Sequence, residues 1–403
     1  MKTIAVIGGG ITGVTTAYAL ARRGFAVTVI ERHRYAGMET SFANGGQLSA
    51  SNAEVWNHRS TLLKGLKWMF TRDAPLLVNP TPSWHKLSWF AEFAAAMPHY
   101  RRNTIETTRL AIAAREHLFA WAHEEAIDFD ARREGILHIY RDRAGFDHAA
   151  KVNQMLAQGG LERRAVTPAE MRAIEPTLAG NFYGGFYTDS DSTGDIHKFT
   201  VGLAAAAARK GVVFQHGQAV RAVHADGRRI EVTLGDDAEP HGFDGVVICA
   251  GTASRALATS LGDRVNVYPV KGYSITVNLD DANSQAAAPT VSLLDDETKL
   301  VTSRLGLDRF RVAGTAEFNG FNRDIRADRI RPLVDWVQRC FPGVNTRHVI
   351  PWAGLRPMMP TMLPRVGAGR APGVFYNTGH GHLGWTLSAV TADMIGEQVL
   401  RAA

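Results

Sequence analysis

The sequence has little of what stabilises small secreted proteins or builds metal sites. It contains 2 cysteines among its 403 residues, Cys249 and Cys340, and they stand far apart. Two isolated cysteines form neither a disulfide framework nor an iron–sulfur or other metal site. We therefore expect no bound metal, with Cys249 in a buried strand and Cys340 at a helix end, both as structural residues.

Long apolar runs are also missing. No stretch reaches the roughly 18 apolar residues needed to cross a bilayer, so we expect no membrane span. The run from Ile4 to Ile7 is too short, and too closely followed by glycines, for the core of a signal peptide. These absences predict a cytoplasmic protein, with peripheral contact at the inner face of the cell membrane left open.

Dense runs of one charge do not occur either. The formal charge is +6, from 45 Lys and Arg against 39 Asp and Glu, and the basic residues stand singly or in pairs such as Arg22-Arg23. This distribution predicts a solvated basic surface, and we expect no nucleic-acid partner. A weak attraction to anionic lipid needs only such a surface. The aromatics between Trp56 and Tyr100 are expected mostly in the core, and for residues 66–70, with their lysine and aromatics, contact with a membrane or a partner is the alternative.

The clearest positive signal lies in the first 31 residues. The apolar residues 4–7 predict a short buried strand, residues 12–23 a helix ended by Gly24, and residues 27–31 a second strand. The turn between the first strand and the helix has glycines at the spacing GxGxxG, namely Gly8, Gly10 and Gly13. The segment therefore reads as a strand-turn-helix-strand unit.

Such a unit binds a dinucleotide for physical reasons. Gly8 permits the tight turn, Gly10 lets backbone N–H groups approach a pyrophosphate at the helix N-terminus, and Gly13 lets helix and strand pack closely. Glu31, at the end of the second strand, can accept hydrogen bonds from an adenosine ribose and would repel a 2′-phosphate. The motif argues against NADP and leaves FAD and NAD open.

The rest of the chain alternates between helical and extended patterns. We expect helices over 103–127, 146–158, 196–209, 330–341 and 385–401, and one that begins after the N-cap Thr167. Strands are expected over 135–140, 182–187, 212–214, 245–249, 267–277, 299–302, 310–314 and 373–377, with a hairpin over 220–233. We expect a turn at 190–195 and a glycine-studded loop from Trp352.

This order predicts an α/β (α+β) fold, in which a discontinuous Rossmann-like nucleotide-binding domain is interrupted by a substrate domain built on a mixed sheet plus helices. The nucleotide-binding domain would comprise 1–50, 190–258 and 349–403. The substrate-binding domain would comprise 51–189 and 259–348. No internal repeat or low-complexity linker is visible.

Four further motifs carry a family resemblance: Glu39-Thr-Ser-Phe-Ala-Asn-Gly-Gly-Gln, Val270-Lys-Gly-Tyr-Ser, Gly354-Leu-Arg-Pro-Met and Asn377-Thr-Gly-His-Gly-His-Leu-Gly-Trp-Thr. With these motifs in this order, the chain resembles the FAD-dependent D-amino acid dehydrogenases of the D-amino acid oxidase superfamily over nearly its whole length. The resemblance implies FAD as cofactor and a small D-amino acid as substrate, oxidised by hydride transfer to flavin N5. It also implies a quinone or another respiratory carrier as electron acceptor.

The resemblance implies a cofactor site assembled from the glycine unit, the loop after Glu39, the turn after the strand 245–249, and the C-terminal glycine loop. Its residues would be Gly8, Gly10, Ile11, Thr12, Gly13, Glu31, Arg32, Thr40, Ser41, Asn44, Gly46, Gln47, Leu48, Ala250, Gly251, Gly379, His380, Gly381, Leu383, Gly384, Trp385 and Thr386. Glycines in the last loop would let backbone N–H groups reach the N1–C2=O edge of the flavin.

Three residues are expected to act on the substrate: Arg356, Tyr273 and His380. Arg356 matches the arginine of the family that binds the substrate carboxylate, and a guanidinium fork holds a carboxylate bidentately. Tyr273 would share that carboxylate through its phenol. Lys271 would lie near the flavin or on the opposite strand face, because alternation allows only one of Lys271 and Gly272 inward.

Relatives commonly continue the Arg-Pro-Met motif with an Asp-Gly pair, where this chain has Thr361-Met362. Three alternatives stay open on the sequence: oxidation of a secondary amine or simple amino acid such as D-proline, hydroxyproline, sarcosine or glycine; an oxidase that uses oxygen; and a non-enzymatic basic binding protein on a nucleotide fold. The preferred side chain, the natural acceptor and the oligomeric state are not determined by the sequence.

Overall fold

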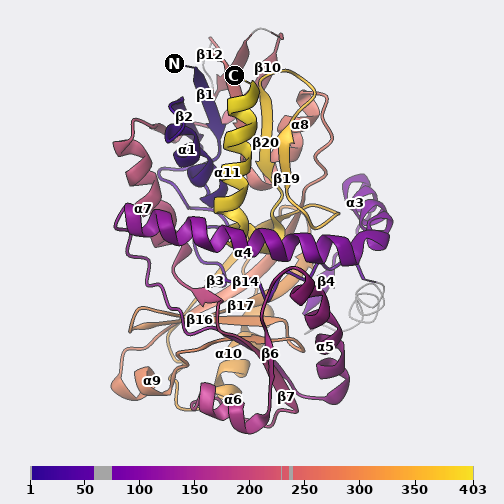
Figure 1. The fold of residues 1–403 in the computed structure, drawn as a ribbon, viewed down its shortest axis with the longest axis vertical. Coiled ribbons are helices and arrows are strands. Elements are labelled where there is room, and N and C mark those ends of the chain that lie inside the picture. The colour runs from indigo at the N-terminus through magenta and orange to yellow at the C-terminus, as the bar shows by residue number, and fades with distance from the viewer. Residues whose placement is uncertain (1, 59–74, 228, 236–238, 403) are drawn as a thin grey trace.

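The computed structural model describes residues 2–58, 75–227, 229–235 and 239–402. It contains two large sheets, one above the other in Figure 1, and the long helix α4 (Tyr100–Glu124) crosses the molecule at the level where they meet. The expected α/β class, with a Rossmann-like part and a second mixed sheet, is confirmed.

The upper sheet has six strands and holds the N-terminal unit. Its order is β19 (Arg365–Ala368), β20 (Val374–Thr378), β13 (Gly245–Ile248), β1 (Thr3–Ile7), β2 (Ala26–Glu31) and β9 (Val213–His216). All pairs are parallel except β19 with β20. The carboxyl ends of β1, β2 and β13 therefore meet at one edge, where α/β sheets bind ligands.

Both faces of this sheet are covered. Ile4 and Val6 of β1 pack into a hydrophobic cluster with the helices α1 (Ile11–Ala21), α7 (Ile196–Arg209) and α11 (Gly384–Ala402). The alternate residues, Ala5 and Ile7, face a three-stranded antiparallel sheet formed by β10 (Val220–Ala225), β11 (Ile230–Leu234) and β12 (His241–Phe243). Strand periodicity explains why each residue of this apolar run is buried.

The lower sheet has nine strands of mixed direction. Its order is β18 (Val349–Met358), β14 (Tyr268–Asn278), β17 (Arg309–Phe318), β16 (Leu300–Leu305), β15 (Ser292–Asp295), β5 (Ile136–Tyr140), β7 (Gly184–Thr188) and β6 (Arg164–Val166), while β4 (Leu76–Val78) pairs with β17. Helix α10 (Ala327–Cys340) covers one face, where Leu333 and Trp336 join a hydrophobic cluster with Ile275 of β14.

The remaining elements connect these layers. They are α3 (Trp84–Ala95), α5 (Arg143–Gln158), α6 (Pro168–Ile174), α8 (Ser254–Ser260), α9 (Ala282–Ala287), the short strands β3 (Gln47–Leu48) and β8 (Ser192–Thr193), and 3-10 turns at 97–99, 251–253 and 381–383. Thr167 caps α6 as expected, because its hydroxyl accepts from the Glu170 N–H at 3.3 Å and its own N–H donates to the Glu170 carboxylate at 2.7 Å. Cys249 directly follows β13, Cys340 ends α10, and both thiols are buried and free.

The prediction that a loop begins at Trp352 is wrong. Residues 349–358 form β18, which pairs antiparallel with β14 along ten residues, from Tyr268 opposite Met358 to Val277 opposite Val349. Pro351, Gly354 and Pro357 weakened the strand signal, but β18 lies at the edge of its sheet, where a proline without an N–H is tolerated. β18 thus joins the lower sheet, although the expected boundary at residue 349 grouped it with the nucleotide-binding part. The domain boundaries themselves stay a prediction.

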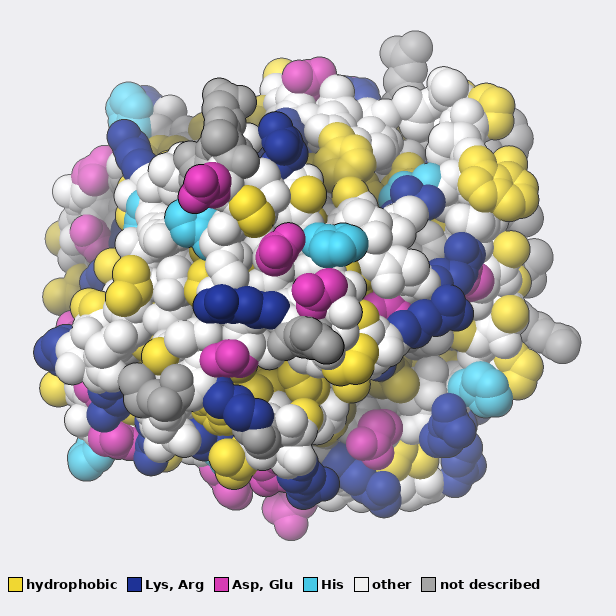
Figure 2. All heavy atoms as spheres, turned by 90° about the horizontal axis from the view of Figure 1, so that it is seen from above, with side chains coloured by type: hydrophobic (Ala, Val, Ile, Leu, Met, Phe, Trp, Pro, Cys, Tyr) yellow, Lys and Arg dark blue, Asp and Glu magenta, His cyan; other side chains and the backbone are white. Residues whose placement is uncertain are grey.

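The surface and the helices bear on membranes and metals. On the face shown in Figure 2, Lys and Arg side chains are interspersed with Asp and Glu. Within the described ranges, no helix combines the length and the apolar character needed to cross a membrane, and no cluster of His, Cys, Asp and Glu is suited to hold a metal. Residues 66–70, with their lysine and aromatics, lie outside the described residues.

The helix–strand contact at Gly13 yields a stability prediction. A Cβ added to Gly13 would lie 1.8 Å from the carbonyl oxygen of Gly8, so Gly13→Ala must push α1 away from β1. We expect a cost of about 1–3 kcal/mol in the free energy of unfolding, as for other overpacked cores, and a lower melting temperature by calorimetry.

Gly145→Ala is the matched control, because Gly145 also lies in a helix and a Cβ there would approach nothing closer than 3.4 Å. That variant should be neutral or slightly stabilised. Equal melting temperatures for both variants would contradict the packing role of Gly13.

Candidate active site

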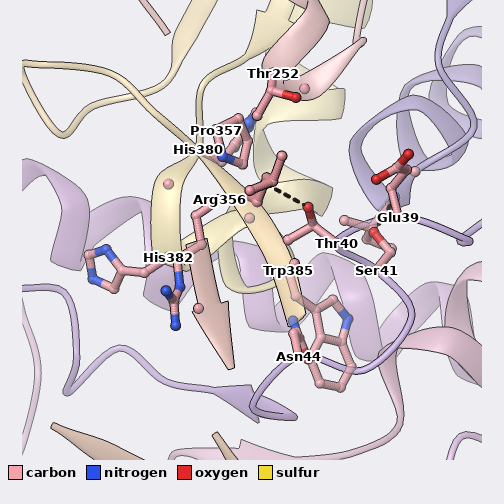
Figure 3. A pocket seen from close by; sticks show the side chains of 18 of the residues that line it. Glu39, Thr40, Ser41, Asn44, Thr252, Arg356, Pro357, His380, His382 and Trp385 are labelled. Carbon is pink, nitrogen blue, oxygen red and sulfur yellow. Dashed lines mark hydrogen bonds between the residues drawn. The ribbon is translucent and has the colours of Figure 1, made fainter. Parts of the chain in front are cut away.

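A cavity of about 640 Å³ is lined by residues from both sheets. Ile7, Glu31 and Cys249 line it at the carboxyl ends of β1, β2 and β13, and Gly272 and Arg356 line it from β14 and β18. Figure 3 shows part of this space, with residues of the loop after β2, of β18 and of the C-terminal loop directed into it. The cavity therefore joins the two parts of the fold.

The glycine unit forms one end of the cavity. A Cβ added to Gly10 would meet only the Ser41 hydroxyl, at 3.6 Å, so the space beside this backbone is open. The Glu31 carboxylate is buried and accepts the N–H groups of Gly9, at 2.5 Å, and His33, at 2.8 Å. These bonds hold the carboxylate at the cavity wall, where a ribose hydroxyl can reach it.

Two helices begin at the cavity. Residues Gly10 to Thr12 at the start of α1 and residues Gly384 to Thr386 at the start of α11 line it, and neither helix has an acidic residue in its first turn. Each helix start carries unpaired N–H groups and a partial positive charge. The cavity thus has two places that favour an anionic group.

The loop after β2 is anchored to the lower sheet. The Thr40 hydroxyl donates to the Leu355 carbonyl at 2.8 Å, a bond drawn in Figure 3, and the Gln47 amide donates to Ser292 and to the Leu293 carbonyl at 2.8 and 3.0 Å. The Ser41 hydroxyl accepts from the Ile11 N–H at 3.0 Å. The loop is therefore bonded to both parts of the fold.

Most of the expected cofactor residues line the cavity, and two do not. Leu48 is fully buried in the hydrophobic cluster around α1 and α11, because alternation in β3 turns Gln47 toward the cavity and Leu48 away from it. Gly13 lies below the cavity, in the α1–β1 contact. The cavity is lined by the others: Gly8, Gly10, Ile11, Thr12, Glu31, Arg32, Thr40, Ser41, Asn44, Gly46, Gln47, Ala250, Gly251, Gly379, His380, Gly381, Leu383, Gly384, Trp385 and Thr386.

Two histidines of the C-terminal loop are held neutral. The His380 ring lies 2.9 Å from the Thr391 hydroxyl, and burial lowers the pKa of His380 to about 3. His382 belongs to the same motif, but no residue pattern distinguishes it from its neighbours. Its ring lies 3.2 Å from the Asn52 carbonyl and is stacked on Trp56, and burial lowers its pKa to about 4. Neither imidazole carries a charge at neutral pH.

Arg356 brings a positive charge into the cavity without a counter-ion. Its guanidinium donates to the carbonyls of Thr315, at 2.9 Å, and Gly314, at 3.5 Å. Burial lowers the pKa of Arg356 to about 10, and in the described part of the chain no carboxylate forms an ion pair with it. A half-buried cation without a counter-ion favours an anionic ligand.

A β-bulge makes room for the Arg356 side chain. Thr315 and Ala316 of β17 oppose the single residue Gly272 of β14, and Thr315 has a left-handed φ of 57°. A Cβ on Gly272 would lie 2.1 Å from a guanidinium nitrogen of Arg356. The bulge turns two carbonyls toward the guanidinium, and the missing side chain of Gly272 leaves its space.

The structure does not bring the Tyr273 hydroxyl to Arg356, contrary to the expectation. That hydroxyl lies 3.3 Å from the Glu317 carboxylate, and the Lys271 amine lies 3.1 Å from the same carboxylate. Strand alternation explains the difference, since Lys271 and Tyr273 share the α10 face of β14 while Gly272 faces Arg356. Of the three expected substrate residues, Arg356 and His380 thus remain with their side-chain groups at the cavity.

Comparison with known proteins decides the family. Residues 3–398 match the DAO family, described as FAD dependent oxidoreductase. The chain belongs to this family. It is 65% identical over 400 residues to "D-amino acid dehydrogenase 3" of Mesorhizobium japonicum, covering 99% of this chain and 97% of the relative. It is 43% identical over 410 residues to "D-amino acid dehydrogenase" of Paramagnetospirillum magneticum, covering 99% and 95%.

Solved structures share the fold at low identity. Glycine oxidase from Geobacillus kaustophilus superposes with a TM-score of 0.77 at 20% identity, covering 100% of this chain and 95% of that one. L-proline dehydrogenase from P. horikoshii superposes with a TM-score of 0.76 at 16% identity, covering 99% and 93%. Because residues 3–398 match the DAO family, the chain is an FAD-dependent oxidoreductase. This excludes the non-enzymatic alternative and confirms FAD as the cofactor.

The residues at the cavity fit FAD. The open backbone at Gly10 and the start of α1 suit a pyrophosphate, and Glu31 suits the adenosine ribose. The second helix start, at Gly384, offers N–H groups at the other end. The cavity thus has separate backbone N–H groups, from α1 and from α11, for the two halves of the cofactor.

Glu31 offers a test of this DAO-family cofactor site. In Glu31→Ala, the ribose loses its acceptor, and the N–H groups of Gly9 and His33 lose theirs. We expect FAD to bind about tenfold or more weakly, measured by titration of the apoprotein with FAD. Glu162→Ala, at an exposed position outside the cavity, is the control and should bind FAD like the unchanged protein. Unaltered FAD affinity in Glu31→Ala would exclude this role.

Proposed function

We propose that this chain is an FAD-dependent dehydrogenase that oxidises a D-amino acid to the imino acid, which water then hydrolyses to a 2-oxo acid and ammonia. The observation that carries the proposal is the Arg356 guanidinium, which is half-buried at the cavity without a carboxylate partner among the described residues. The 65% identity to a protein named D-amino acid dehydrogenase 3 supports the choice of substrate.

Arg356 would bind the substrate carboxylate bidentately through its guanidinium fork. Its bonds to the Thr315 and Gly314 carbonyls hold the fork in one orientation, so that the bound α-carbon lies in a fixed place. When bound, FAD supplies the acceptor for the hydride that leaves this carbon. Positioning by Arg356 would supply most of the rate enhancement that comes from the protein.

The histidines and the tyrosine near the expected site offer no effective base for the substrate amine. His380 and His382 are neutral, and burial together with the nearby Glu317 charge raises the pKa of Tyr273, whose hydroxyl is turned away. The substrate amine would therefore react in its neutral form, and its lone pair would form the C=N bond as the hydride leaves. The amine proton would be lost to solvent before the reaction.

For the cofactor, we propose that the start of α1 and Glu31 hold the ADP half. The loop 379–381 and the start of α11 would hold the flavin, with their N–H groups toward its N1–C2=O edge. A quinone or another respiratory carrier would accept the electrons, and the protein would meet it by peripheral contact with the membrane. Secondary amino acids or glycine are the rival substrates, because glycine oxidase and L-proline dehydrogenase share the fold.

Arg356 gives the sharpest test of the proposed substrate. Arg356→Lys keeps the charge and loses the fork, so we expect kcat/KM for D-amino acids to fall by about 10- to 150-fold while the protein keeps its flavin. Gly272→Ala should act in the same direction, because a Cβ there would occupy the place of the guanidinium. Anaerobic bleaching of the flavin near 450 nm measures the reaction.

The control for both variants is Gly145→Ala, whose rate should match that of the unchanged enzyme. Full activity toward D-amino acids in Arg356→Lys and in Gly272→Ala would overturn the assignment of Arg356. Glycine, sarcosine and proline belong in the same assay, and faster bleaching by any of them than by D-amino acids would favour the rival substrates.

The acceptor is tested separately from the substrate. After reduction by a D-amino acid, we expect a soluble quinone to reoxidise the flavin faster than dissolved oxygen does, followed by return of the absorbance near 450 nm in a stopped-flow instrument. Faster reoxidation by oxygen would identify the enzyme as an oxidase.

A further inference from the structure

Four ionisable side chains that do not belong to the glycine unit line one wall of the cavity. They are Glu54, His148, Asp296 and Lys299. Glu54 follows β3, His148 lies in α5, and Asp296 and Lys299 lie in the turn between β15 and β16. β15 and β16 belong to the lower sheet, whereas β3 pairs with β8 in a separate two-stranded sheet. We call these four residues the polar wall.

Two of the charges on the polar wall form an ion pair with each other, whereas the Glu54 carboxylate has no Lys or Arg partner among the described residues. The Lys299 amine lies 2.5 Å from the Asp296 carboxylate, so these two charges neutralise each other. The Glu54 carboxylate accepts from the Tyr100 hydroxyl at 2.5 Å, and the His148 ring lies 3.7 Å from the same oxygen. In the described part of the chain, no Lys or Arg side chain forms an ion pair with Glu54.

Glu54 is ionised and accessible from the cavity. Burial favours the neutral acid, but the neighbouring His148 and Tyr100, together with the charge of Lys299, hold the pKa of the Glu54 carboxyl below its ordinary value. Its side chain is 32% exposed. The polar wall therefore presents one negative charge that a ligand in the cavity can reach.

An aromatic surface lies next to Glu54 and next to Arg356. Trp56, two residues after Glu54, is stacked on His382, with ring centroids 5.0 Å apart. The charges of Arg356 and Glu54 both act on His382, and Figure 3 shows His382 beside Arg356. A methylene chain can pack on this uncharged pair while its two ends meet Arg356 and Glu54.

We propose that the polar wall selects D-amino acids whose side chain ends in a cationic hydrogen-bond donor, an ammonium or a guanidinium, and that Glu54 accepts that group. The inference rests on the proposed function, because Arg356 must hold the α-carboxylate for the side chain to point toward Glu54. A charge-assisted hydrogen bond to a partly desolvated carboxylate discriminates strongly against a substrate that lacks the donor.

Other side chains fit this wall less well. An acidic side chain would meet Glu54 as a like charge, and Lys299 is already paired with Asp296. An apolar chain of the same length would displace water from Glu54 without replacing its hydrogen bonds. Both cases leave a penalty that a cationic donor avoids.

D-Lysine and D-norleucine form the matched pair for the test, because they differ at the end of an otherwise equal chain. With the FAD-loaded enzyme under anaerobic conditions, we expect kcat/KM for D-lysine to exceed that for D-norleucine by about tenfold or more, with D-arginine like D-lysine and D-glutamate poorest. Glu54→Gln keeps the size and the bond from Tyr100, and it should lower the D-lysine to D-norleucine ratio by about tenfold.

Two further variants complete the design. Glu162→Gln, at an exposed position outside the cavity, should leave the ratio unchanged. Lys299→Met removes the positive charge of the polar wall and should raise the ratio. This second variant keeps the proposal testable where Glu54→Gln fails to retain flavin.

The outcomes separate the two proposals. If D-norleucine or D-glutamate matches D-lysine in the unchanged enzyme, or if the ratio survives in Glu54→Gln, the role of the polar wall is overturned while D-amino acid oxidation stands. If no D-amino acid bleaches the flavin, the proposed function falls and the role of the polar wall falls with it.

Discussion

The unpaired guanidinium of Arg356 is the interaction on which the candidate site depends. A half-buried arginine without a carboxylate is unfavourable by itself, and hydrogen bonds to the carbonyls of Thr315 and Gly314 compensate part of that cost. Those carbonyls are available because β17 bulges opposite Gly272, and the bulge leaves Thr315 in a left-handed conformation. The cavity therefore keeps one positive charge, on Arg356, that an anionic ligand can neutralise.

On the opposite face of β14, which packs against α10, buried charges are paired with one another. There Lys271, Glu317 and Arg329 form a buried ion network, with 3.1 Å and 2.8 Å between the two cations and the carboxylate. Each of these charges has a partner, as buried charges require. One strand thus separates a satisfied set of charges under α10 from an unsatisfied one in the cavity, and the alternation of its side chains keeps the two apart.

The loop that follows β2 is hydrogen-bonded to both sheets or their helices and fixes their relative position. Ser41 accepts the first N–H of α1, Thr40 donates to β18 through the Leu355 carbonyl, and Gln47 donates to β15. A cofactor that spans the cavity would therefore meet groups whose relative positions are set by strands and helices. This arrangement suits a reaction in which positioning supplies most of the rate enhancement.

The sequence by itself determined the glycine unit and the elements around it. Apolar runs, the GxGxxG spacing and Glu31 act over a few residues, so β1, α1 and β2 could be predicted, and so could α7 and the capping of α6 by Thr167. Arg356 was identified by family resemblance and not by its neighbours in the chain. Local signals also failed at 349–358. The prolines and glycine of residues 351–357 indicated a loop, but these residues form a strand at the edge of a sheet, where prolines are tolerated.

Only the tertiary structure decided which side chains share the cavity. The face on which Tyr273 lies depends on the register of β14 with β18, the space for the guanidinium depends on a bulge in β17, and the polar wall joins a loop, a helix and a turn far apart in the chain. These are long-range contacts, and no window of sequence contains both partners. Residue types and spacings therefore predicted a dinucleotide site, and the family resemblance predicted FAD. Strand register decided the geometry around Arg356 and the charges that face it.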